Sequence, residues 1–297
     1  MKYTGRDKSR YRNGEKPTWC RGCSYYSVLD ALTRVFARKG IDPQKVNVIS
    51  GIGCSSRLPL FLDTLGMHTL HGRALPVAVG ARLARPDIPV VVVAGDGDLF
   101  SIGTSHFVHT ARKNFDLTVL CLDNRNYAMT KNQSSPTSPA GHRGSLTPFG
   151  KLSVPLNVPE FAIASGATLV SRTLSSAQDH MRGCISQAFE HKGFSLVEIL
   201  APCRKFDREA ADDLSGCTRD LQCHPFHDRT AALKAASGAY AYDPDGSRPV
   251  PVGLFWKTER STFEEQVESV RKTWEAKVTI DDLLNEADVG NRQKAAI

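Results

Sequence analysis

Short apolar runs alternate with longer amphipathic segments over the first two thirds of the chain. Residues 88–95, IPVVVVAG, are apolar at nearly every position, which is typical of a parallel strand covered on both faces. In residues 27–40 the apolar side chains recur at the spacing of one helical face, and Gly40 suits the end of that helix. The two patterns predict a buried strand and an amphipathic helix.

Both patterns recur in a regular order along the chain. Strand-like runs occupy residues 45–50, 88–95, 117–123, 167–172 and 194–200. Helix-like segments occupy residues 27–40, 73–85, 100–114, 159–165 and 175–191. Because strands that alternate with helices usually pair in parallel, the pattern predicts an α/β fold with a parallel sheet and helices on both faces.

Three regions of the chain differ in pattern. Residues 1–17 are polar and irregular, and we expect an N-terminal arm there. Residues 18–205 carry the alternating pattern and are expected to form the α/β domain. The alternation breaks down in residues 206–297, which we interpret as a C-terminal extension with a linker-like stretch at 243–253 and an amphipathic helix at 262–277.

One long segment inside the α/β region has no periodicity. Residues 130–158 are rich in Ser, Pro, Gly and Thr. Long structureless loops are uncommon in compact domains and usually serve a function. We therefore expect this loop to be functional.

The composition is that of an ordinary globular protein: 41% of the 297 residues are hydrophobic and 23% are charged. No apolar run approaches the ~20 residues of a membrane-spanning helix. The polar, basic N-terminus lacks the apolar stretch of a signal peptide. We therefore expect a cytoplasmic protein with no membrane partner.

The chain is basic, with a formal net charge of +7. Such an excess suits nucleic acid, a phosphorylated cofactor or an acidic protein partner. The basic residues are scattered apart from a modest cluster at 2–16, and no basic stripe is interleaved with aromatic residues. We therefore expect no nucleic-acid partner.

Eight cysteines in a chain of this kind argue for metal ligands, reactive thiols or small core residues rather than a disulfide scaffold. Cys20 and Cys23 form a C-x-x-C pair, which supplies two of the four thiolates that a metal centre usually needs. Cys121 and Cys184 fall on predicted strand and helix faces and are expected in the core. A competing zinc set has unusual spacing and comprises Cys217, Cys223, His224 and His227.

Polar turns follow two successive predicted strands. GDGD (95–98) comes after the strand at 88–95, and DNRNY (123–127) comes after the strand at 117–123. In an open parallel sheet, ligands bind beyond the carboxyl ends of the strands, where glycine lets the backbone approach a phosphate. Asp96 and Asn124 are oxygen donors of the kind that hold Mg²⁺ together with a phosphorylated ligand. The pair of turns predicts such a site.

At this point the sequence resembles the thiamine-diphosphate enzymes, and in particular the β subunit of the 2-oxoacid:ferredoxin oxidoreductases. The resemblance covers residues 18–203, about two thirds of the chain. It is carried, in family order, by the strings WCRGC, SGIGCSSR, HTLHGRALPVAVG, VAGDGD, IGTSHFVHTARKN, DNRNYAMTKNQSSPTSP and HKGFSLVEILAPC. Arg21 and Ser24 depart from the Pro and Gly that are common in the family motif.

The resemblance implies specific cofactors and ligands for this chain. A [4Fe–4S] cluster would be held by Cys20, Cys23, Cys54 and Cys203. Mg²⁺ would be held by Asp96, Asn124 and the main-chain carbonyl of Asn126. The thiamine diphosphate itself would be contacted by Ile52, Gly53, Cys54, Ser55, His71, Gly95, Gly97, Asp98, Ala128 and Met129.

The resemblance also implies a reaction. The GCSSR string is most like the 2-oxoglutarate branch, and we expect Arg57, together with His71, to act in the reaction. A guanidinium binds a carboxylate with two parallel hydrogen bonds, so Arg57 is a candidate for recognising the acid. The expected reaction is oxidative decarboxylation of 2-oxoglutarate with coenzyme A. Pyruvate or another 2-oxoacid is the alternative substrate.

The resemblance finally implies partners. The chain has one α/β domain of sufficient size, whereas thiamine enzymes use two, so an α subunit is expected, as is ferredoxin as the electron acceptor. The alternative from another class is a basic, zinc-holding nucleic-acid-binding module. That alternative accounts for the charge and the C-x-x-C pair but leaves the two strand-end motifs unexplained.

Overall fold

A single eight-stranded sheet forms the centre of the chain in the computed structural model, which describes residues 7–208, 218–221, 226, 228–237 and 250–275. The strand order is β2-β1-β3-β4-β8-β7-β10-β9. The strands are β1 (Asn47–Ser50), β2 (Leu65–His68), β3 (Val90–Gly95), β4 (Thr118–Asp123), β7 (Leu169–Leu174), β8 (Ser195–Leu200), β9 (Thr218–Asp220) and β10 (Val250–Lys257). All neighbours pair in parallel except β10, which runs antiparallel to β7.

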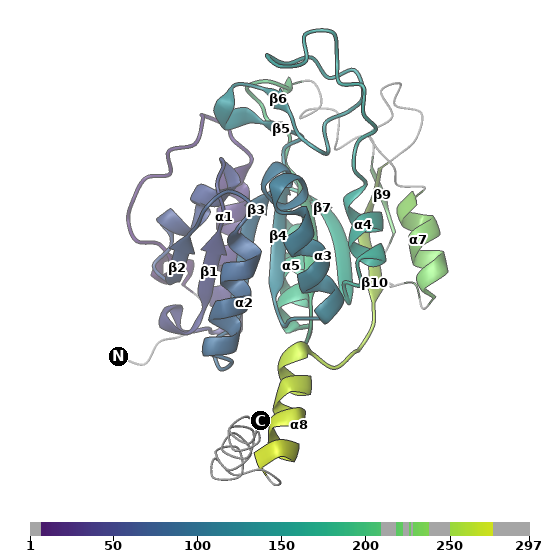
Figure 1. Cartoon of the computed structure of the whole chain (residues 1–297). Coiled ribbons are helices and arrows are strands. Elements are labelled where there is room, and N and C mark those ends of the chain that lie inside the picture. The colour runs from purple at the N-terminus through teal and green to yellow at the C-terminus, as the bar shows by residue number, and fades with distance from the viewer. Residues whose placement is uncertain (1–6, 209–217, 222–225, 227, 238–249, 276–297) are drawn as a thin grey trace, which may run out of the picture.

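Helices cover both faces of the sheet (Figure 1). The α-helices are α1 (Tyr25–Lys39), α2 (Ala74–Ala84), α3 (Thr104–Lys113), α4 (Val158–Ala164), α5 (Gln178–Glu190), α7 (Arg229–Ser237) and α8 (Phe263–Glu275). Five shorter turns are η1 (Lys8–Tyr11), η2 (Pro43–Lys45), η3 (Ser55–Phe61), η4 (Asp98–Ile102) and η5 (Ala128–Thr130). A two-stranded hairpin, β5 (Asn126–Tyr127) with β6 (Gln133–Ser134), completes the elements.

The alternation of side chains along the central strands builds two cores. Val91 and Val93 of β3 pack with α1 and α5 on one face, while Val90 and Val92 pack with α2 and α3 on the other. Every residue of β4 and β8 is buried. This burial explains why these strands are apolar at most positions, as is typical of a parallel sheet with two covered faces.

The predicted strands and helices of the α/β region are present, with shifts of one to three residues at most ends. The segment predicted as one helix at 100–114 is divided, because the π-helical turn η4 precedes α3. The edge strand β2 was missed: Leu65–His68 is short and largely exposed, so it lacks an apolar pattern.

The C-terminal extension contributes to the same sheet, which the sequence did not predict. Residues 250–253, interpreted as the end of a linker, belong to β10, where Gly253 pairs with Arg172 of β7. Pro251 and Gly253 weaken the local strand pattern. β10 forms because the edge of β7 is available for pairing, and local sequence cannot reveal a partner so far along the chain. Helix α7 packs in the same region through buried Ala232 and Ala236.

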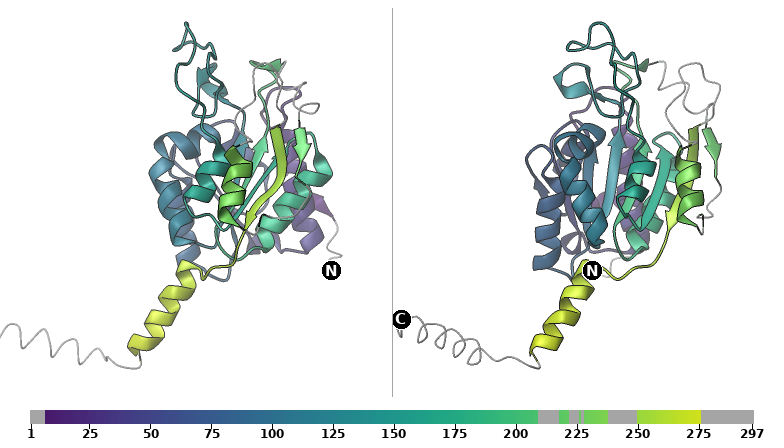
Figure 2. Two further views of the ribbon diagram at one scale, coloured as in Figure 1. Left: turned by 90° about the vertical axis from the view of Figure 1, so that its right-hand side faces the viewer. Right: turned by 45° about the vertical axis from the view of Figure 1, so that its right-hand side comes forward.

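Helix α8 leaves the body at the amino edge of the sheet and projects away from it (Figures 1 and 2). Its start is a capping box, in which the Thr262 hydroxyl accepts from the Glu265 N–H at 3.2 Å and the Glu265 carboxylate accepts from the Thr262 N–H at 2.9 Å. The predicted apolar side of α8 is only partly covered, since Val267 and Val270 are exposed. No helix in the described ranges is long and apolar enough to cross a membrane.

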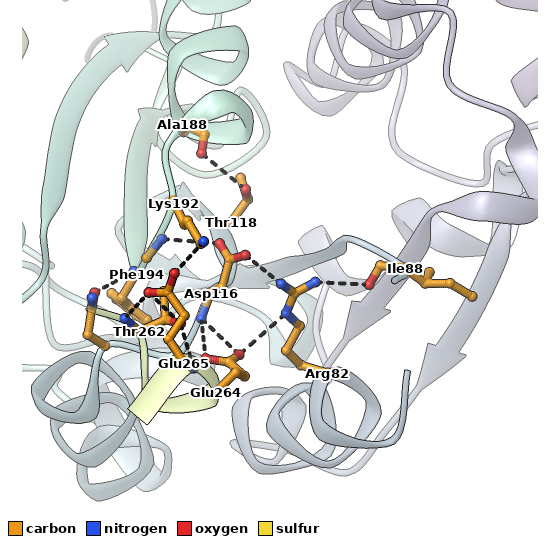
Figure 3. A network of polar contacts seen from close by, with 12 residues as sticks. Arg82, Ile88, Asp116, Thr118, Ala188, Lys192, Phe194, Thr262, Glu264 and Glu265 are labelled. Carbon is orange, nitrogen blue, oxygen red and sulfur yellow. Dashed lines mark hydrogen bonds and ion pairs between the residues drawn. The ribbon is translucent and has the colours of Figure 1, made fainter. Parts of the chain in front are cut away.

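A polar network fastens α8 to the sheet (Figure 3). The Arg82 guanidinium contacts the Asp116 carboxylate at 2.5 Å and the Glu264 carboxylate at 3.3 Å. Glu264 also accepts from the Asp116 N–H at 3.1 Å, and Lys192 pairs with Glu265. Each charged group in this network therefore faces an opposite charge or a backbone amide.

Candidate functional site

Two adjoining pockets open at the carboxyl edge of the sheet. Figure 1 shows that β5 and β6 lie above this edge. The smaller has a volume of about 120 Å³ and the larger about 580 Å³. They share five lining residues: Tyr25, Cys54, Asn124, Ala128 and Met129. Anything bound in one pocket therefore lies next to the contents of the other.

The smaller pocket gathers nearly all of the residues predicted to contact thiamine diphosphate or Mg²⁺. Its lining includes the predicted Ile52, Gly53, Cys54, Ser55, His71, Gly95, Asp96, Gly97, Asn124, Asn126, Ala128 and Met129. Asp98 is the one predicted cofactor contact that does not line it. Tyr25, Tyr127 and Thr130 also line it and were missed by the sequence analysis.

Asp96 and Asn124 meet because β3 and β4 are parallel neighbours in register, with Gly95 opposite Leu122. The turn after β4 is held by side chains: Asp123 accepts from the Arg125 N–H at 2.9 Å, and Asn124 accepts from the Asn126 N–H at 3.3 Å. Arg125 has a φ of 58°, in the left-handed region, which this tight turn imposes. The side-chain oxygen of Asn126 is buried and has no hydrogen-bond partner among the described residues.

The Asp96 carboxylate lies in an unusual buried setting. The Thr137 hydroxyl, from the 130–158 loop, lies 2.6 Å from Asp96 and 2.8 Å from Asp123. One hydroxyl carries one proton, so it can donate to only one of the two carboxylates at a time. Burial and the nearby Asp123 charge together raise the pKa of Asp96 to about 7. The ionised form of Asp96 is therefore disfavoured in the ligand-free chain, and a bound cation would stabilise it.

Glycine is needed at position 97 because the ring of Tyr127 occupies the space that a side chain would take. A Cβ on Gly97 would lie 2.2 Å from the Tyr127 ring, whose hydroxyl donates to the Gly97 carbonyl at 3.3 Å. A Cβ on Gly95 would lie 2.9 Å from the Ser55 hydroxyl. Close packing of these turns leaves the backbone exposed to the pocket, as a phosphate-binding loop requires.

Asp98 connects the 51–53 turn to the loop at His71 and Gly72, although it does not line the smaller pocket. One oxygen of its carboxylate accepts from the Gly72 N–H at 2.7 Å and the Ile52 N–H at 3.1 Å, and it contacts His71 Nδ1 at 2.5 Å. The other oxygen is buried against Gly51 and has no hydrogen-bond partner within the described residues. Asp98 thus positions the 51–53 turn and His71, a role that the motif alone did not reveal.

The larger cavity brings together all four of the cysteines predicted as cluster ligands, Cys20, Cys23, Cys54 and Cys203. Burial raises the pKa of Cys23 to about 11, and the other three thiols add to the effect. Burial, followed by Cys203 and Cys20, likewise raises the pKa of Cys54, while Arg57 opposes the shift. The four thiols are therefore close enough to interact electrostatically across the cavity that they line.

The C-x-x-C turn is braced by aromatic packing. The Trp19 indole donates to the Cys54 carbonyl at 2.7 Å and packs edge-on against Phe61, with ring centroids 5.0 Å apart. The Cys23 N–H donates to the Cys20 carbonyl at 3.0 Å, which closes the turn. These contacts join the N-terminal segment to the GIGC turn, and so bring Cys20, Cys23 and Cys54 to one cavity although 34 positions separate the first and last.

The arrangement of the four cysteines distinguishes between the two kinds of metal centre that thiolates hold, a single ion and a cluster. In the part of the chain that the structure describes, no three His, Cys, Asp or Glu side chains gather closely enough for one metal ion. A zinc ion would need its thiolates within about 2.3 Å of a single point. Four thiolates around one cavity of about 580 Å³ suit a group with several metal atoms, such as an iron–sulfur cluster.

The other candidate residues have clear locations. Arg57 lines the larger cavity rather than the smaller one. Cys121 and Cys184 are buried in the two cores, as predicted. The competing zinc set of Cys217, Cys223, His224 and His227 lies outside the described residues.

Comparison with known proteins gives one consistent family. Residues 51–199 match the family described as "Thiamine pyrophosphate enzyme, C-terminal TPP binding domain". The chain is 36% identical over 276 residues to the "2-oxoacid:ferredoxin oxidoreductase 1, subunit beta" of Aeropyrum pernix, covering 88% of this chain and 85% of that protein. It is 36% identical over 253 residues to the "2-oxoglutarate synthase subunit KorB" of Archaeoglobus fulgidus, covering 85% and 89%.

A solved structure extends the similarity to the whole fold. The structure of the "2-oxoglutarate:ferredoxin oxidoreductase from Magnetococcus marinus with 2-oxoglutarate, coenzyme A and succinyl-CoA bound" superposes with a TM-score of 0.88 at 37% identity, covering 96% of this chain and 97% of that one. The fold of this chain therefore agrees with that of the solved relative. The chain belongs to the β-subunit family of the 2-oxoacid:ferredoxin oxidoreductases, thiamine pyrophosphate-dependent enzymes.

Proposed function

We propose that this chain is the β subunit of a 2-oxoglutarate:ferredoxin oxidoreductase. The complete reaction converts 2-oxoglutarate, coenzyme A and two oxidised ferredoxins into succinyl-CoA, CO₂, a proton and two reduced ferredoxins. The observation that carries the proposal is the shared wall between a pocket lined by the predicted cofactor residues and a cavity lined by four cysteines. Oxidation of a substrate by one-electron carriers requires such adjacent sites.

Asp96, Asn124 and the main-chain carbonyl of Asn126 are the proposed Mg²⁺ ligands. The raised pKa of Asp96 and the unpartnered Asn126 oxygen nearby support a cation at this position, because both features leave oxygen atoms in need of positive charge. Gly95 and Gly97 keep the backbone accessible to the diphosphate. When bound, thiamine diphosphate supplies the electron sink that loss of CO₂ from a 2-oxoacid needs.

Cys20, Cys23, Cys54 and Cys203 are the proposed ligands of a [4Fe–4S] cluster. Cys54 also lines the smaller pocket, so its backbone and thiol connect the two sites. Tyr25 fills the wall between them, with its hydroxyl donating to the Leu122 carbonyl at 3.4 Å. Electrons released in the smaller pocket therefore have a short route outward.

An α subunit is proposed because the smaller pocket is too small to enclose thiamine diphosphate by itself. Pockets that enclose organic cofactors usually measure ~300–1,000 Å³. At about 120 Å³ the smaller pocket can hold part of such a molecule and leaves the rest exposed. A second subunit then covers the remainder of the cofactor and contributes to coenzyme A binding.

The proposal of 2-oxoglutarate rests on the names of the relatives and on Arg57. Two curated relatives, from Mycobacterium tuberculosis (41% identity over 204 residues) and Archaeoglobus fulgidus, are named for 2-oxoglutarate. Arg57 borders Cys54, which lies between the two pockets, and is half-buried with its charge acting on that thiol. From there we propose that it recognises the distal carboxylate of the acid, while His71, fixed by Asp98, contacts the cofactor.

The test is an anaerobic substrate panel on the chain co-expressed with its α subunit, with viologen reduction as the readout. We expect a brown complex that oxidises 2-oxoglutarate in preference to pyruvate. Arg57→Met should lower kcat/KM for 2-oxoglutarate by about 10–100-fold, the value of a charged hydrogen-bonded pair, and should affect pyruvate less. A clear pyruvate preference in the unmodified complex would refute the substrate assignment and leave the enzyme type standing.

A further inference from the structure

A row of buried charged side chains crosses the sheet from the proposed Mg²⁺ site to β7. Its members are Asp96, Asp123, Glu198 and Arg172, here named the charged row, and none of them is more than 5% exposed. They stand on or directly after β3, β4, β8 and β7, which are neighbours in that order. Asp96 is a proposed Mg²⁺ ligand, whereas the other three have no part in the function proposed above.

The register of the parallel strands places the charged row on one face of the sheet. Glu198 of β8 pairs with Arg172 of β7 on one side and with Cys121 of β4 on the other. Side chains two positions apart in a strand point to the same face, so Asp123 lies on the same side as Cys121. Asp96 continues the row at the end of β3. The pairing of four strands therefore assembles the row.

Short polar contacts join the members of the charged row. The Arg172 guanidinium donates to the Glu198 carboxylate at 2.6 Å. Glu198 is in turn hydrogen-bonded to the side chain of Asp123. The Thr137 hydroxyl lies 2.8 Å from Asp123 and 2.6 Å from Asp96. These contacts form one continuous chain from Arg172 to Asp96.

Thr137 is held in place by contacts on both sides of it. The buried Lys151 ammonium donates to the Pro136 carbonyl at 2.9 Å and to the Ser138 carbonyl at 2.8 Å. The Ser138 hydroxyl also donates to the Arg125 carbonyl in the turn after β4. The 130–158 loop therefore presents the Thr137 hydroxyl to the two carboxylates from a fixed backbone.

Stability alone is a poor explanation for Glu198 and Arg172. Removing two charges from water costs free energy that their mutual attraction often fails to recover, and an apolar pair is commonly as stable. Burial raises the pKa of Glu198 to about 7 although Arg172 opposes the shift, and Asp123 adds to the rise through its charge and its hydrogen bond. The pair is better explained by what it holds, which is the Asp123 side chain.

We propose that Glu198 and Arg172 are positioning residues for the Mg²⁺ site. They hold Asp123, and through Asp123 and Thr137 they fix the direction of the Asp96 carboxylate. The inference rests on the proposed function, since it takes Asp96 as a Mg²⁺ ligand. Residues that orient a metal ligand without touching the metal commonly raise metal affinity by about 10–100-fold.

The test measures ion binding by the anaerobic complex of both subunits, freed of Mg²⁺ with EDTA and supplied with thiamine diphosphate. Mn²⁺ is the probe, because carboxylate and carbonyl oxygens bind it as they bind Mg²⁺, and its EPR signal counts the free ion. The pair variant, Arg172→Met/Glu198→Leu, replaces the two charges by apolar side chains, a change that buried sites commonly accept. The control variant, Arg82→Met/Glu264→Leu, makes the same change in the network at the amino edge.

Two single variants separate position from charge. Glu198→Gln removes the charge but keeps the length, and its amide can accept from Arg172 and donate to Asp123. Glu198→Asp keeps the charge but is one CH₂ shorter, so it cannot reach both neighbours. Both changes are small enough to decide the question even where the pair variant does not fold.

We expect the Mn²⁺ Kd to rise by about 10–100-fold in the pair variant, with little change in its unfolding temperature. Glu198→Asp should show a large part of this loss, whereas Glu198→Gln should bind Mn²⁺ almost as the unmodified complex does. The control variant should bind the ion normally, although it is less stable. Mg²⁺ titrated in competition with Mn²⁺ should give the same order of affinities.

Four results would overturn the proposal. An unchanged Kd in Glu198→Asp and in a folded pair variant would show that the row serves only the core. A lower Kd in the pair variant, or a loss in Glu198→Gln with none in Glu198→Asp, would show that the row acts through its charge. Equal weakening in the control would mean a general effect of losing an ion pair. Absence of Mn²⁺ binding by the unmodified complex would refute the site itself.

The proposed function can fail separately. An unmodified complex that binds Mn²⁺ and thiamine diphosphate but does not oxidise 2-oxoglutarate would refute the proposed reaction. The comparison of Kd values would still decide whether Glu198 and Arg172 position the ion site, because it does not depend on turnover.

Discussion

The two edges of the same sheet use charged side chains in opposite ways. At the amino edge, Arg82 lies between Asp116 and Glu264, and each carboxylate also has a defined hydrogen-bonding role (Figure 3). At the carboxyl edge, two buried carboxylates share one hydroxyl, and one oxygen of Asp98 has no hydrogen-bond partner in the described chain. The first arrangement is complete without a ligand, whereas the second is not.

This difference separates residues kept for stability from residues kept for binding. Buried polar groups are normally paired, because an unpaired one costs about 1–3 kcal/mol. An edge that leaves several groups unpaired is destabilised until a ligand supplies the missing charge. The amino edge should therefore lose stability when its charges are removed. The ligand-free carboxyl edge should gain stability when the repelled carboxylate of Asp96 is removed.

The largest expected effect is that of Asp96→Asn. Without a carboxylate for Mg²⁺, activity of the complex should fall by ~10³-fold or more, comparable with loss of a principal electrostatic group in an active site. The free energy of unfolding of the ligand-free chain should meanwhile rise by up to about 4 kcal/mol at pH 8, because the pKa of Asp96 is raised from 3.8 to about 7 and each unit corresponds to about 1.4 kcal/mol.

The pH dependence of that gain follows from the sign of the shift. The pKa of Asp96 is raised in the folded chain from 3.8 to about 7. Below pH 4 the carboxyl is neutral in both states and costs nothing; between pH 4 and 7 the unfolded chain ionises first, so the folded state loses stability. Urea titrations in EDTA should show Asp96→Asn equal to the original chain at pH 4 and more stable at pH 8. Destabilisation at both values would contradict the comparison.

Asp98→Ala should destabilise the carboxyl edge, because Asp98 holds the loops at Ile52 and Gly72 in place. The backbone N–H groups of Ile52 and Gly72 would lose their acceptor, which should lower the free energy of unfolding by about 2–3 kcal/mol. Displacement of the 51–53 turn should also weaken thiamine diphosphate binding, measured by calorimetry. Asp98→Asn keeps an acceptor oxygen and should recover part of both losses. Removal of the fully exposed Asp179 side chain is the matched control and should change neither.

Arg82→Met tests the amino edge. Asp116 and Glu264 would lose their cation, which should cost about 1–2 kcal/mol of unfolding free energy, less than a fully buried pair because all three side chains retain some solvent contact. Activity should be unchanged. A double-mutant cycle with Glu264→Gln should reveal coupling between the two residues. A large loss of activity with normal stability would show that this edge also serves the site.

The smallest effect is expected for Tyr127→Phe. The substitution removes a hydroxyl that donates to the Gly97 carbonyl at 3.3 Å but keeps the ring that packs on Gly97. Stability should fall by less than about 1 kcal/mol, and cofactor affinity should change little. Gly97→Ala, which forces the ring away, should reduce affinity far more. Similar effects of the two variants would indicate that the hydroxyl, rather than the ring, shapes the pocket.

Much of the carboxyl-edge pocket was predictable because its residues follow strands in fixed order. Asp96 and Asn124 occur directly after apolar runs, and parallel pairing brings such positions together whatever the rest of the fold. The direction of the Asp98 carboxylate was not predictable, because the glycine turn places it toward Gly72 and Ile52 through contacts made far along the chain. The aromatic residues Tyr25 and Tyr127 gave no signal that distinguishes a pocket wall from a core residue.

The sequence by itself determined the alternation of strands and helices, the two strand-end turns and the C-x-x-C pair, because periodicity and turn chemistry act over a few residues. Which distant residues meet was decided by the tertiary structure: β10 pairs with β7, and Cys203 lines one cavity with the other three cysteines, a set that local pattern did not reveal and only the family resemblance predicted. These contacts depend on how whole elements pack, and packing energy is shared among many residues that no short stretch of sequence contains.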